Sequence, residues 1–600
     1  MAGNKLIQRR TLQISADSLP PEMHPVVKRV YQARNVSGHD ALDRSLDRLH
    51  KPDSLLGIKE AAHLLAETIK DDGRILIVAD FDTDGATSCT LAVRALKKMG
   101  AAHVHYLVPD RAIHGYGLTP AIVEEAACHS PNLIITVDNG ISSVAGVETA
   151  KAHGIKVLVT DHHLPGNDLP AADVIVNPNQ PGDTSQCKTL AGVGVIFYVM
   201  LALRAYLREQ KWFEQQSIAE PNLAQWLDLV ALGTVADLVP LDENNRRLVA
   251  QGLARINHGQ CVAGIRALLV EGKRANRTLG ASDLGFFVAP RLNAAGRLED
   301  MSVGIECLLT DDEQVARQLA SRLDEINHER REIQQAMQAQ ALSAMEQLDL
   351  EASALPTGLC LFDERWHQGV VGLVASRLKE RYHRPAIAMA PAGDGELKGS
   401  ARSISGLHIR DTLDQLATHY PHLLQRFGGH AMAAGLTIRR DDFDAFAAAF
   451  DGLVAQQLSE NDLKEVLLSD GELEADELQL SMAEIIRDAG PWGQGFPEPL
   501  FEGTFQVVSR RIVGGKHVKM VLRHGDGVKV DAIAFNQHED ESTHKLQQIH
   551  AVYRLDINEF RGVRSVQLIV VHMSPPVSRP GVPSETKKLL PGNDEAQEVA

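Results

Sequence analysis

A buried strand that ends in a run of aspartates constrains this sequence more than any other feature. Residues 75–79 are apolar over the length of a strand, and Asp80, Asp82 and Asp84 follow directly. Three neighbouring carboxylates repel one another, and each costs free energy to desolvate. A divalent cation removes that objection, because carboxylate oxygens suit Mg²⁺ and Mn²⁺. The alternative is a solvated acidic turn, which rarely follows so apolar a strand.

Length and composition indicate several domains rather than one. A chain of 600 residues is too long for a single core, so we expect three or four domains. No apolar run approaches the length of a membrane helix, and the first ten residues lack the apolar segment of a signal peptide. The six cysteines contain no CxxC pair and are interpreted as reduced thiols, which predicts a cytoplasmic protein. The net charge of −17 argues against unspecific coating of nucleic acid, but it permits a local basic groove.

From residue 75 the chain alternates short apolar strands with helical segments, which is typical of a parallel sheet with helices on both faces. Further strands are expected at 103–108, 132–137, 156–160 and 173–176. Ligands of such sheets bind at the carboxyl ends of the strands.

Acids and histidines gather at those strand ends. Asp138 follows one strand, the triplet Asp161-His162-His163 follows another, and Asp237 follows an apolar helical segment. Carboxylates combined with imidazole favour Mn²⁺, with Mg²⁺ and Zn²⁺ as competitors. Alone, the histidine pair is as compatible with a structural role as with a functional one. Beside the aspartates it predicts one shared metal site.

Two further segments of this first domain have the composition of phosphate contacts. Residues 109–117 carry Arg111 and Tyr116 among glycines, and residues 290–297 carry Arg291 and Asn293 among small residues. An arginine guanidinium can donate two hydrogen bonds to a phosphate, and small residues let the backbone approach it closely. Arg111 is equally compatible with a surface ion pair.

A charged helical stretch from residue 311 to about 350 is interpreted as a helix that joins two domains, in preference to a coiled-coil surface. A second α/β domain follows it. Its two glycine-rich segments, 398–403 and 427–435, resemble anion cradles in composition, although such loops are commonly only turns. The candidate DNA contacts in them are Ser400, Arg402, Gly429 and His430.

Beyond residue 467 the pattern changes to short alternating runs. Strands are expected at 503–512, 516–523, 528–535, 551–560 and 564–572, which suggests a closed barrel such as the OB-fold. Basic residues along these strands, with Lys516 and Lys519 among them, and the aromatic side chains of Phe535, Tyr553 and Phe560 suit single-stranded nucleic acid. A solvated barrel surface with core aromatics is the alternative.

The four motifs at 80–85, 138–140, 161–163 and 233–237 resemble those of the DHH phosphoesterase superfamily, whose signature is the Asp-His-His triplet. The resemblance extends over nearly the whole chain and is strongest to the bacterial single-strand-specific exonucleases. Together with the patterns above, it divides the chain into an N-terminal extension (1–50), a DHH catalytic domain (51–315), a linker helix (316–350), a DHH-associated domain (351–456) and an OB-fold (467–573). The last residues are rich in Pro, Gly, Ser and Glu, which predicts a disordered tail (574–600).

The same resemblance implies roles for the site residues. Asp84, Asp138, His162 and Asp237 would hold one metal, whereas Asp82 and Asp138, with Asp80 close by, would hold a second. His163 would lie beside the scissile phosphate, and with Arg291 and Asn293 it would stabilise the charge that develops there.

The expected activity is that of a 5′→3′ exonuclease on single-stranded DNA, acting in DNA repair and recombination with two Mn²⁺ or Mg²⁺ ions. A monomer is expected, with single-strand-binding protein and a helicase as partners. The alternatives are a phosphodiesterase for short oligonucleotides or cyclic dinucleotides, and a non-catalytic DNA-binding scaffold. The N-terminal extension and the barrel count against the first, and the complete ligand set counts against the second.

Overall fold

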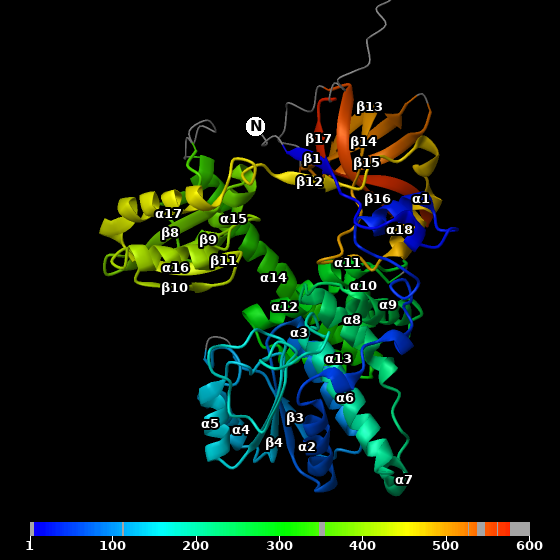
Figure 1. Ribbon diagram of the computed structural model, residues 1–600, viewed down its shortest axis with the longest axis vertical. Coiled ribbons are helices and arrows are strands. Elements are labelled where there is room, and N and C mark those ends of the chain that lie inside the picture. The colour runs from blue at the N-terminus through cyan, green and yellow to red at the C-terminus, as the bar shows by residue number, and fades with distance from the viewer. Residues whose placement is uncertain are drawn as a thin grey trace, which may run out of the picture. The chain divides into compact units, whose positions relative to one another are not determined.

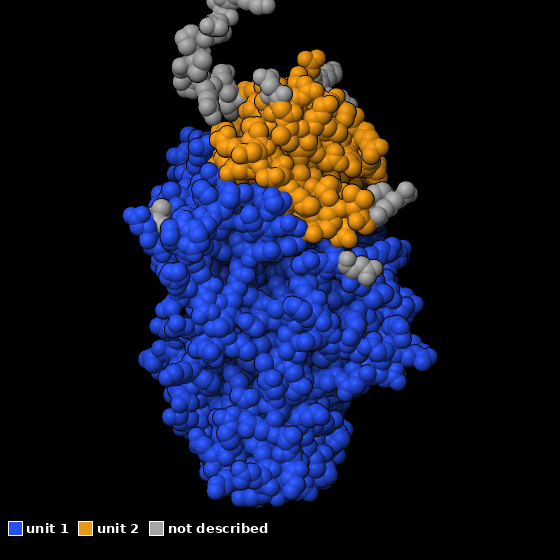
Figure 2. All heavy atoms as spheres, turned by 90° about the vertical axis from the view of Figure 1, so that its right-hand side faces the viewer, with its two compact units in different colours: residues 1–470, 481–499 blue, residues 471–480, 500–600 orange. Residues whose placement is uncertain are grey.

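A computed structural model describes residues 5–110, 113–275, 277–346, 355–525, 527–536, 546–560 and 562–576. The chain, drawn as a ribbon in Figure 1, forms two compact units, which Figure 2 shows in different colours. Unit 1 comprises Met1–Asp470 and Ser481–Pro499, and unit 2 comprises Gly471–Leu480 and Leu500–Ala600. The chain therefore leaves unit 1 after Asp470, returns at Ser481 and leaves it again after Pro499. No helix within the described ranges is both long and apolar enough to cross a membrane.

The first domain contains the expected parallel sheet, with strand order β3-β2-β4-β5-β6. Its strands are β2 (Ile75–Ala79), β3 (Val104–Leu107), β4 (Leu133–Val137), β5 (Lys156–Thr160) and β6 (Val174–Val176). The helices that cover it are α2 (Ile58–Lys70), α3 (Thr83–Lys98), α4 (Pro120–Ala127), α5 (Val144–Ala152) and α6 (Gly192–Glu209).

Both faces of the central strands β2 and β4 are fully buried, which explains why these two strands are almost continuously apolar. Alternate residues of β2 enter different cores. Ile75 and Ile77 pack into the core that contains α2, α3 and α6, whereas Leu76 and Val78 pack into the core formed with α4 and α5. Figure 1 shows α4 and α5 on one side of the strands and α2 on the other.

A helical region completes the first domain and leads into the linker. Its helices are α7 (Trp212–Gln216), α8 (Leu227–Ala236), α9 (Glu243–Asn257), α10 (Ala263–Glu271), α11 (Ala281–Asp283), α12 (Ala289–Leu298), α13 (Ser302–Leu309) and α14 (Glu313–Glu346). The long helix α14 occupies the stretch where the charged linker helix was predicted. Its first turns are packed into the domain, since Ala316, Ala320 and Leu323 are fully buried.

The second α/β domain is a mixed sheet of order β10-β11-β9-β8-β7. Only β7 and β8 run parallel. The strands are β7 (Leu359–Phe362), β8 (Ala386–Gly393), β9 (Glu396–Arg402), β10 (Arg426–Gly429) and β11 (Ala433–Arg439), and the helices are α15 (Val371–Tyr382), α16 (Ile409–His419) and α17 (Phe443–Gln457).

Unit 2 contains the predicted barrel. Five strands close in the order β13-β14-β15-β17-β16, with β13 also pairing β16. They are β13 (Phe501–Val513), β14 (His517–His524), β15 (Lys529–Ala534), β16 (Gln548–Phe560) and β17 (Val563–Ser574). The predicted fold class, a parallel-sheet domain, a second α/β domain and a C-terminal barrel, is confirmed. The predicted tail from residue 574 lies outside the described residues from 577 onward.

The N-terminal extension is bound to residues 466–470, the last residues of unit 1 before the chain first enters unit 2. Strand β1 (Leu6–Arg9) pairs in parallel with β12 (Val466–Ser469). Helix α1 (Pro25–Gln32) is followed by Arg34, whose Nη1 and Nη2 donate to the two oxygens of Asp470 at 2.6 and 3.0 Å. Only 2% of the Arg34 side chain and none of the Asp470 side chain is exposed. This buried ion pair between Arg34 and Asp470 therefore fixes the N-terminal extension to residue 470.

We predict that Arg34→Ala lowers the free energy of unfolding by about 2–3 kcal/mol, because it removes two hydrogen bonds to the buried Asp470 carboxylate, while the contact with Arg10 at 3.8 Å remains. The matched control is Arg208→Ala. Arg208 pairs with Glu220 at 2.5 Å, but 54% of its side chain is exposed, so that change is expected to cost about 0–1 kcal/mol. Thermal and urea unfolding of the two variants checks this. Equal losses would show that the Arg34 fork contributes no more than a surface pair.

Candidate metal centre

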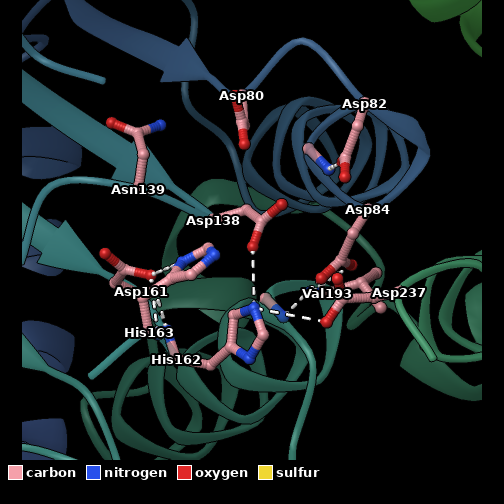
Figure 3. A network of polar contacts seen from close by, with 12 residues as sticks. Asp80, Asp82, Asp84, Asp138, Asn139, Asp161, His162, His163, Val193 and Asp237 are labelled. Atoms are coloured by element: carbon pink, nitrogen blue, oxygen red, sulfur yellow. Dashed lines mark hydrogen bonds and ion pairs between the residues drawn. The ribbon is translucent and has the colours of Figure 1, made fainter. Parts of the chain in front are cut away.

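Three adjacent strands of the first sheet deliver acids to one edge. Ala79 pairs with Val137, and Val137 pairs with Thr160. The residues that follow them, Asp80, Asp138 and Asp161, therefore lie side by side where the strands end (Figure 3). All three residues are at most 6% exposed. Parallel pairing in register thus brings the strand-end acids together.

The start of α3 adds two more carboxylates. Asp82 is the N-cap of this helix, and its Oδ1 accepts from the Gly85 amide at 3.0 Å. Asp84, in the first turn, accepts from the amides of Gly192 at 2.6 Å and Val193 at 2.9 Å, which begin α6. A helix N-terminus carries partial positive charge and attracts a carboxylate. The Asp84 side chain is therefore held by the backbone of a second helix.

His162 and Asp237 close the cluster from the opposite side. Nε2 of His162 lies 3.1 Å from Asp138 Oδ1 and 3.4 Å from Asp237 Oδ2. The side-chain Nδ2 of Asn179 donates to the His162 backbone oxygen at 2.6 Å and fixes this turn. Within the described residues, neither Asp138 Oδ1 nor His162 Nε2 has a hydrogen-bond partner of good geometry. Two buried groups that face each other in this way fit a cation held between them.

Three overlapping sets of ligand atoms each lie within 4.8 Å of one another. Asp84, His162 and Asp237 form one set, and Asp80, Asp82 and Asp138 form another. A third set joins Asp138 with the two histidines, so Asp138 is shared. Carboxylate and imidazole donors of this kind fit Mn²⁺ or Mg²⁺. The residues present would therefore hold such an ion.

Electrostatic repulsion inside the cluster is strong. Burial, and then the charge of Asp82, raises the pKa of Asp80 to about 7. Burial and Asp82 likewise raise the pKa of Asp237 to about 7. The pKa values of Asp84 and Asp138 lie well above the usual value because both are buried among the other carboxylates. Ionised together, these groups require positive charge nearby.

The two histidines have different charge states. Burial lowers the pKa of His162 to about 4, so its imidazole is neutral and can offer a lone pair. Burial also acts to lower the pKa of His163, but the hydrogen bond to Asp161 and the charges of Asp161, Asp237 and Asp80 together outweigh it, and the pKa rises to about 9. Nδ1 of His163 lies 2.8 Å from Asp161 Oδ1. A protonated His163 suits an anion better than it suits a metal ion.

Glycines allow the close approach of helices to this cluster. A Cβ atom on Gly192 would lie 2.6 Å from Asp138 Cβ and Oδ1. On Gly233 it would lie 2.7 Å from Asp84 Oδ1. The sequence motifs included Gly233 but not Gly192, Val193 or Asn179. The sequence signal of Gly192 and Val193 is the Gly-Val-Gly run at residues 192–194, which does not reveal that the run packs against Asp84 and Asp138.

Asn293 and Arg291 occupy different positions. The Asn293 Oδ1 accepts from the Thr83 amide at 2.8 Å and from the Thr83 hydroxyl at 2.7 Å, between Asp82 and Asp84. Asn293 therefore holds the first turn of α3. The Arg291 guanidinium instead pairs with Asp324 of α14 at 2.7 Å and donates to the Phe287 and Glu271 carbonyls. These contacts of Arg291 lie within the helical region, outside the carboxylate cluster.

An aromatic row borders the metal ligands. The ring of Tyr116 makes edge contacts with Phe81 and His163, at centroid distances of 5.9 and 6.1 Å. Tyr116 is 51% exposed, so part of its surface remains open. Arg111, the other candidate of this segment, lies outside the described residues.

The second domain gathers its candidate residues in a cluster of their own. Arg402 donates to the Ser400 hydroxyl at 2.7 Å, and Arg402 pairs with Ala433 across the sheet. Gly429 pairs with Ala434 of the same strand, and the His430 amide donates to the Ala433 carbonyl at 2.8 Å. Strands β9, β10 and β11 thus bring Ser400, Arg402, Gly429 and His430 together.

The barrel carries its candidate lysines on the outside, and one aromatic expectation needs correction. Lys516 is exposed, and Lys519 lies 3.4 Å from Asp531 in an ion pair. Phe535 is 48% exposed and contacts His517. The expectation of a stacking role for Tyr553 is wrong, because this residue is fully buried and packs against Phe501 and Phe505. The side chain of Phe560 lies outside the described residues.

Comparisons with known proteins agree with this arrangement. Residues 74–234 match the DHH family N-terminal domain, residues 355–456 match the DHHA1 domain, and residues 469–572 match the RecJ OB domain.

Among whole proteins, the chain is 53% identical over 577 residues to the single-stranded-DNA-specific exonuclease RecJ of Dickeya dadantii (strain 3937), covering 95% of this chain and 100% of that protein. It is 50% identical over 573 residues to that of Escherichia coli (strain K12), covering 95% and 99%. The crystal structure of RecJ in complex with Mn²⁺ from Thermus thermophilus is similar with a TM-score of 0.73 and 30% identity, covering 95% of this chain and 80% of that chain.

Asp138→Asn tests the repulsion directly. In metal-free protein at pH 8 the variant is expected to unfold at a higher temperature than wild type, because it removes a carboxyl whose raised pKa makes it destabilising at this pH. A carboxyl whose folded pKa is raised destabilises the fold as the pH rises above its unfolded pKa near 3.8. The difference should therefore shrink as the pH falls from 8 towards 4. Scanning calorimetry measures it, and a variant less stable at pH 8 would contradict the clustered charges.

Proposed function

This chain belongs to the RecJ family of single-stranded-DNA-specific exonucleases, and we propose that it removes nucleotides from the 5′ end of single-stranded DNA by metal-dependent hydrolysis. One observation carries the proposal. Asp138 belongs to the ligand set of Asp80 and Asp82, and its Oδ1 lies 3.1 Å from Nε2 of His162, which belongs to the set of Asp84 and Asp237. A single carboxylate, that of Asp138, would therefore bridge a pair of ions. Two-metal sites of this kind hydrolyse phosphodiesters.

The ligands divide the work between two ions. Asp84, Asp138, His162 and Asp237 would hold one ion, and Asp80, Asp82 and Asp138 would hold the other. When bound, Mn²⁺ or Mg²⁺ would lower the pKa of a water and neutralise charge on the phosphate. The protein keeps His162 neutral by burial and keeps Asp84 in place through the α6 amides. Asn293 holds the turn that carries Asp82 and Asp84.

His163 is proposed to contact the scissile phosphate. Its raised pKa gives it a positive charge at neutral pH, and 45% of its side chain is exposed. Asp161 orients its ring from behind through Nδ1. A fixed cation at this position would stabilise the charge that develops on the phosphate oxygens. Tyr116 and Phe81, beside it, offer ring surface to the terminal sugar or base.

We propose that the second domain recognises the 5′ end of the strand and thereby sets the direction of the reaction. The Arg402 guanidinium and Ser400 hydroxyl lie beside Gly372 at the start of α15, where an added Cβ would approach Arg402 Nη2 to 3.1 Å. Burial lowers the pKa of Arg402, although it remains a cation at neutral pH. A helix start, an arginine and a hydroxyl together suit a terminal 5′ phosphate.

The barrel is proposed to hold the strand away from the cut. Lys516, Lys519 and the exposed ring of Phe535 are contacts that its described surface offers. Backbone neutralisation and stacking bind single strands without sequence preference. A monomer acting in the cytoplasm in repair and recombination, with single-strand-binding protein and a helicase as partners, completes the proposal and rests on the family alone.

Nucleotide release from end-labelled DNA tests the activity. With Mn²⁺, 5′-labelled single strands should lose label as mononucleotides from the first turnover, whereas 3′-labelled strands should shorten stepwise and blunt duplexes should persist. Asp138→Asn should reduce turnover on the order of 10³-fold, because loss of a bridging ligand costs several kcal/mol in the transition state. Initial label loss from the 3′ end would reverse the proposed polarity, and turnover within about tenfold of wild type would remove Asp138 from the site.

Arg402→Ala is expected to weaken binding of 5′-phosphorylated strands by about 1–3 kcal/mol, the scale of a charge-assisted hydrogen bond. Strands with a 5′ hydroxyl should bind almost as before. Fluorescence anisotropy on protein that also carries Asp138→Asn separates binding from cleavage. Equal weakening for both kinds of end would make Arg402 a general backbone contact.

A further inference from the structure

The segment Pro491–Pro497 folds into a compact loop that belongs to unit 1. The rings of Trp492 and Phe496 stack at a centroid distance of 5.0 Å. The Gly493 amide donates to the Phe496 carbonyl at 2.9 Å, and the Phe496 amide donates back at 3.2 Å. We call residues 491–497 the aromatic loop. Nothing in the proposed chemistry uses it.

The aromatic loop packs directly against the segment that follows Asp237. The Leu241 amide donates to the Gln494 carbonyl at 2.7 Å. A Cβ atom on Gly493 would lie 2.7 Å from Leu241 Cδ1, and one on Gly495 would lie 3.2 Å from Pro240 Cβ. Gly495 also has a φ of +70°, which favours glycine. The two glycines thus let the loop's backbone reach the ligand segment.

The segment between Asp237 and Leu241 is strained. Leu238, directly after the ligand, has a φ of +60° and is 71% exposed. A leucine in this region costs free energy and persists only where its surroundings enforce it. Asp237 lies at the end of α8 on one side of Leu238. The contacts of Pro240 and Leu241 with the aromatic loop fix the other side.

A chain of hydrogen bonds also links Pro240 to the start of α6, which holds Asp84. The Asn245 amide group donates to the Pro240 carbonyl at 2.9 Å and to the Thr189 carbonyl at 2.7 Å. Thr189 also donates its hydroxyl to Asp242. Three residues after Thr189, the α6 amides begin to hold Asp84. Asp84 and Asp237 belong to one ligand set with His162.

The aromatic loop is itself firmly anchored. The Arg246 guanidinium of α9 lies over the Phe496 ring at 4.1 Å. Arg34 donates to the Pro497 carbonyl at 2.9 Å while its other nitrogens hold Asp470. Trp492 donates its indole N–H to the Ile486 carbonyl at 3.0 Å. Each of these partners lies in unit 1, so the loop is a rigid support rather than a free connection.

We propose that the aromatic loop is a positioning element of the metal centre, which sets the separation of Asp84 and Asp237 and thereby the affinity for the ion they share. The inference rests on the proposed metal site. Groups that orient metal ligands from behind commonly change affinity by about 10- to 100-fold when they are altered. Because residues 481–499 lie in the chain between two stretches of unit 2, removing everything after residue 470 would also remove this support.

Phe496→Leu tests the proposal against Phe450→Leu. Both phenylalanines are buried, but Phe450 stacks on Phe446 in the core of the second domain. Both variants are expected to unfold at a lower temperature. Only Phe496→Leu should raise the Mn²⁺ dissociation constant, on the order of tenfold. Electron paramagnetic resonance of unbound Mn²⁺, titrated into metal-depleted full-length protein at a temperature where each variant is folded, measures this without reference to activity.

A second pair avoids dependence on one core substitution. Gly493→Ala pushes a methyl group towards Leu241, whereas Gly452→Ala places one where nothing lies within 4 Å. The first should weaken Mn²⁺ binding and the second should not. Unchanged affinity in both Phe496→Leu and Gly493→Ala would overturn the positioning role while leaving the metal site standing. Failure of wild type to bind Mn²⁺ would overturn the proposed function as well.

Discussion

Repulsion among carboxylates at one edge of a parallel sheet is the constraint on which the rest of this structure depends. In-register pairing of β2, β4 and β5 forces Asp80, Asp138 and Asp161 together. Hydrogen-bond donors offset the negative charge of individual carboxylates. Backbone amides of α6 donate to Asp84, and the His163 ring and the Ile141 amide donate to Asp161. The Oδ1 atom of Asp138 has no such compensation from a good hydrogen bond in the described residues. The cluster is therefore better suited to holding a cation than to satisfying its charges through its own hydrogen bonds.

Local patterns were sufficient to predict the strands and to nominate the acids at their ends. Parallel strands buried on both faces are apolar throughout, and barrel strands alternate, so both kinds have a distinct sequence signature. The end of a strand also fixes where the next residue lies. Side-chain direction has no such signature. Arg291 shares its motif with Asn293, yet it turns towards Asp324 in α14, and Tyr553 turns into the barrel core.

Contacts between distant segments were the other limit of prediction. The glycines and aromatics of residues 491–497 indicated a loop, but its partner at Pro240 and Leu241 lies about 250 positions earlier and has no matching pattern. The same holds for Gly192, whose lack of a side chain has meaning only beside Asp138. Such pairs depend on tertiary packing, and no local pattern in a single sequence reveals which distant segments will pack together.

The adjacent histidines show how one sequence motif acquires two chemistries. Their ring centroids are 4.5 Å apart. His162 faces carboxylates that a cation would neutralise, so burial decides and its imidazole stays neutral. His163 contacts Asp161, whose carboxylate accepts from its ring and keeps its own pKa low despite burial. Environments that push neighbouring pKa values apart commonly separate a ligand from a charge-stabilising group. In the proposed reaction, Asp161 would therefore act by orienting and charging His163 rather than as a metal ligand.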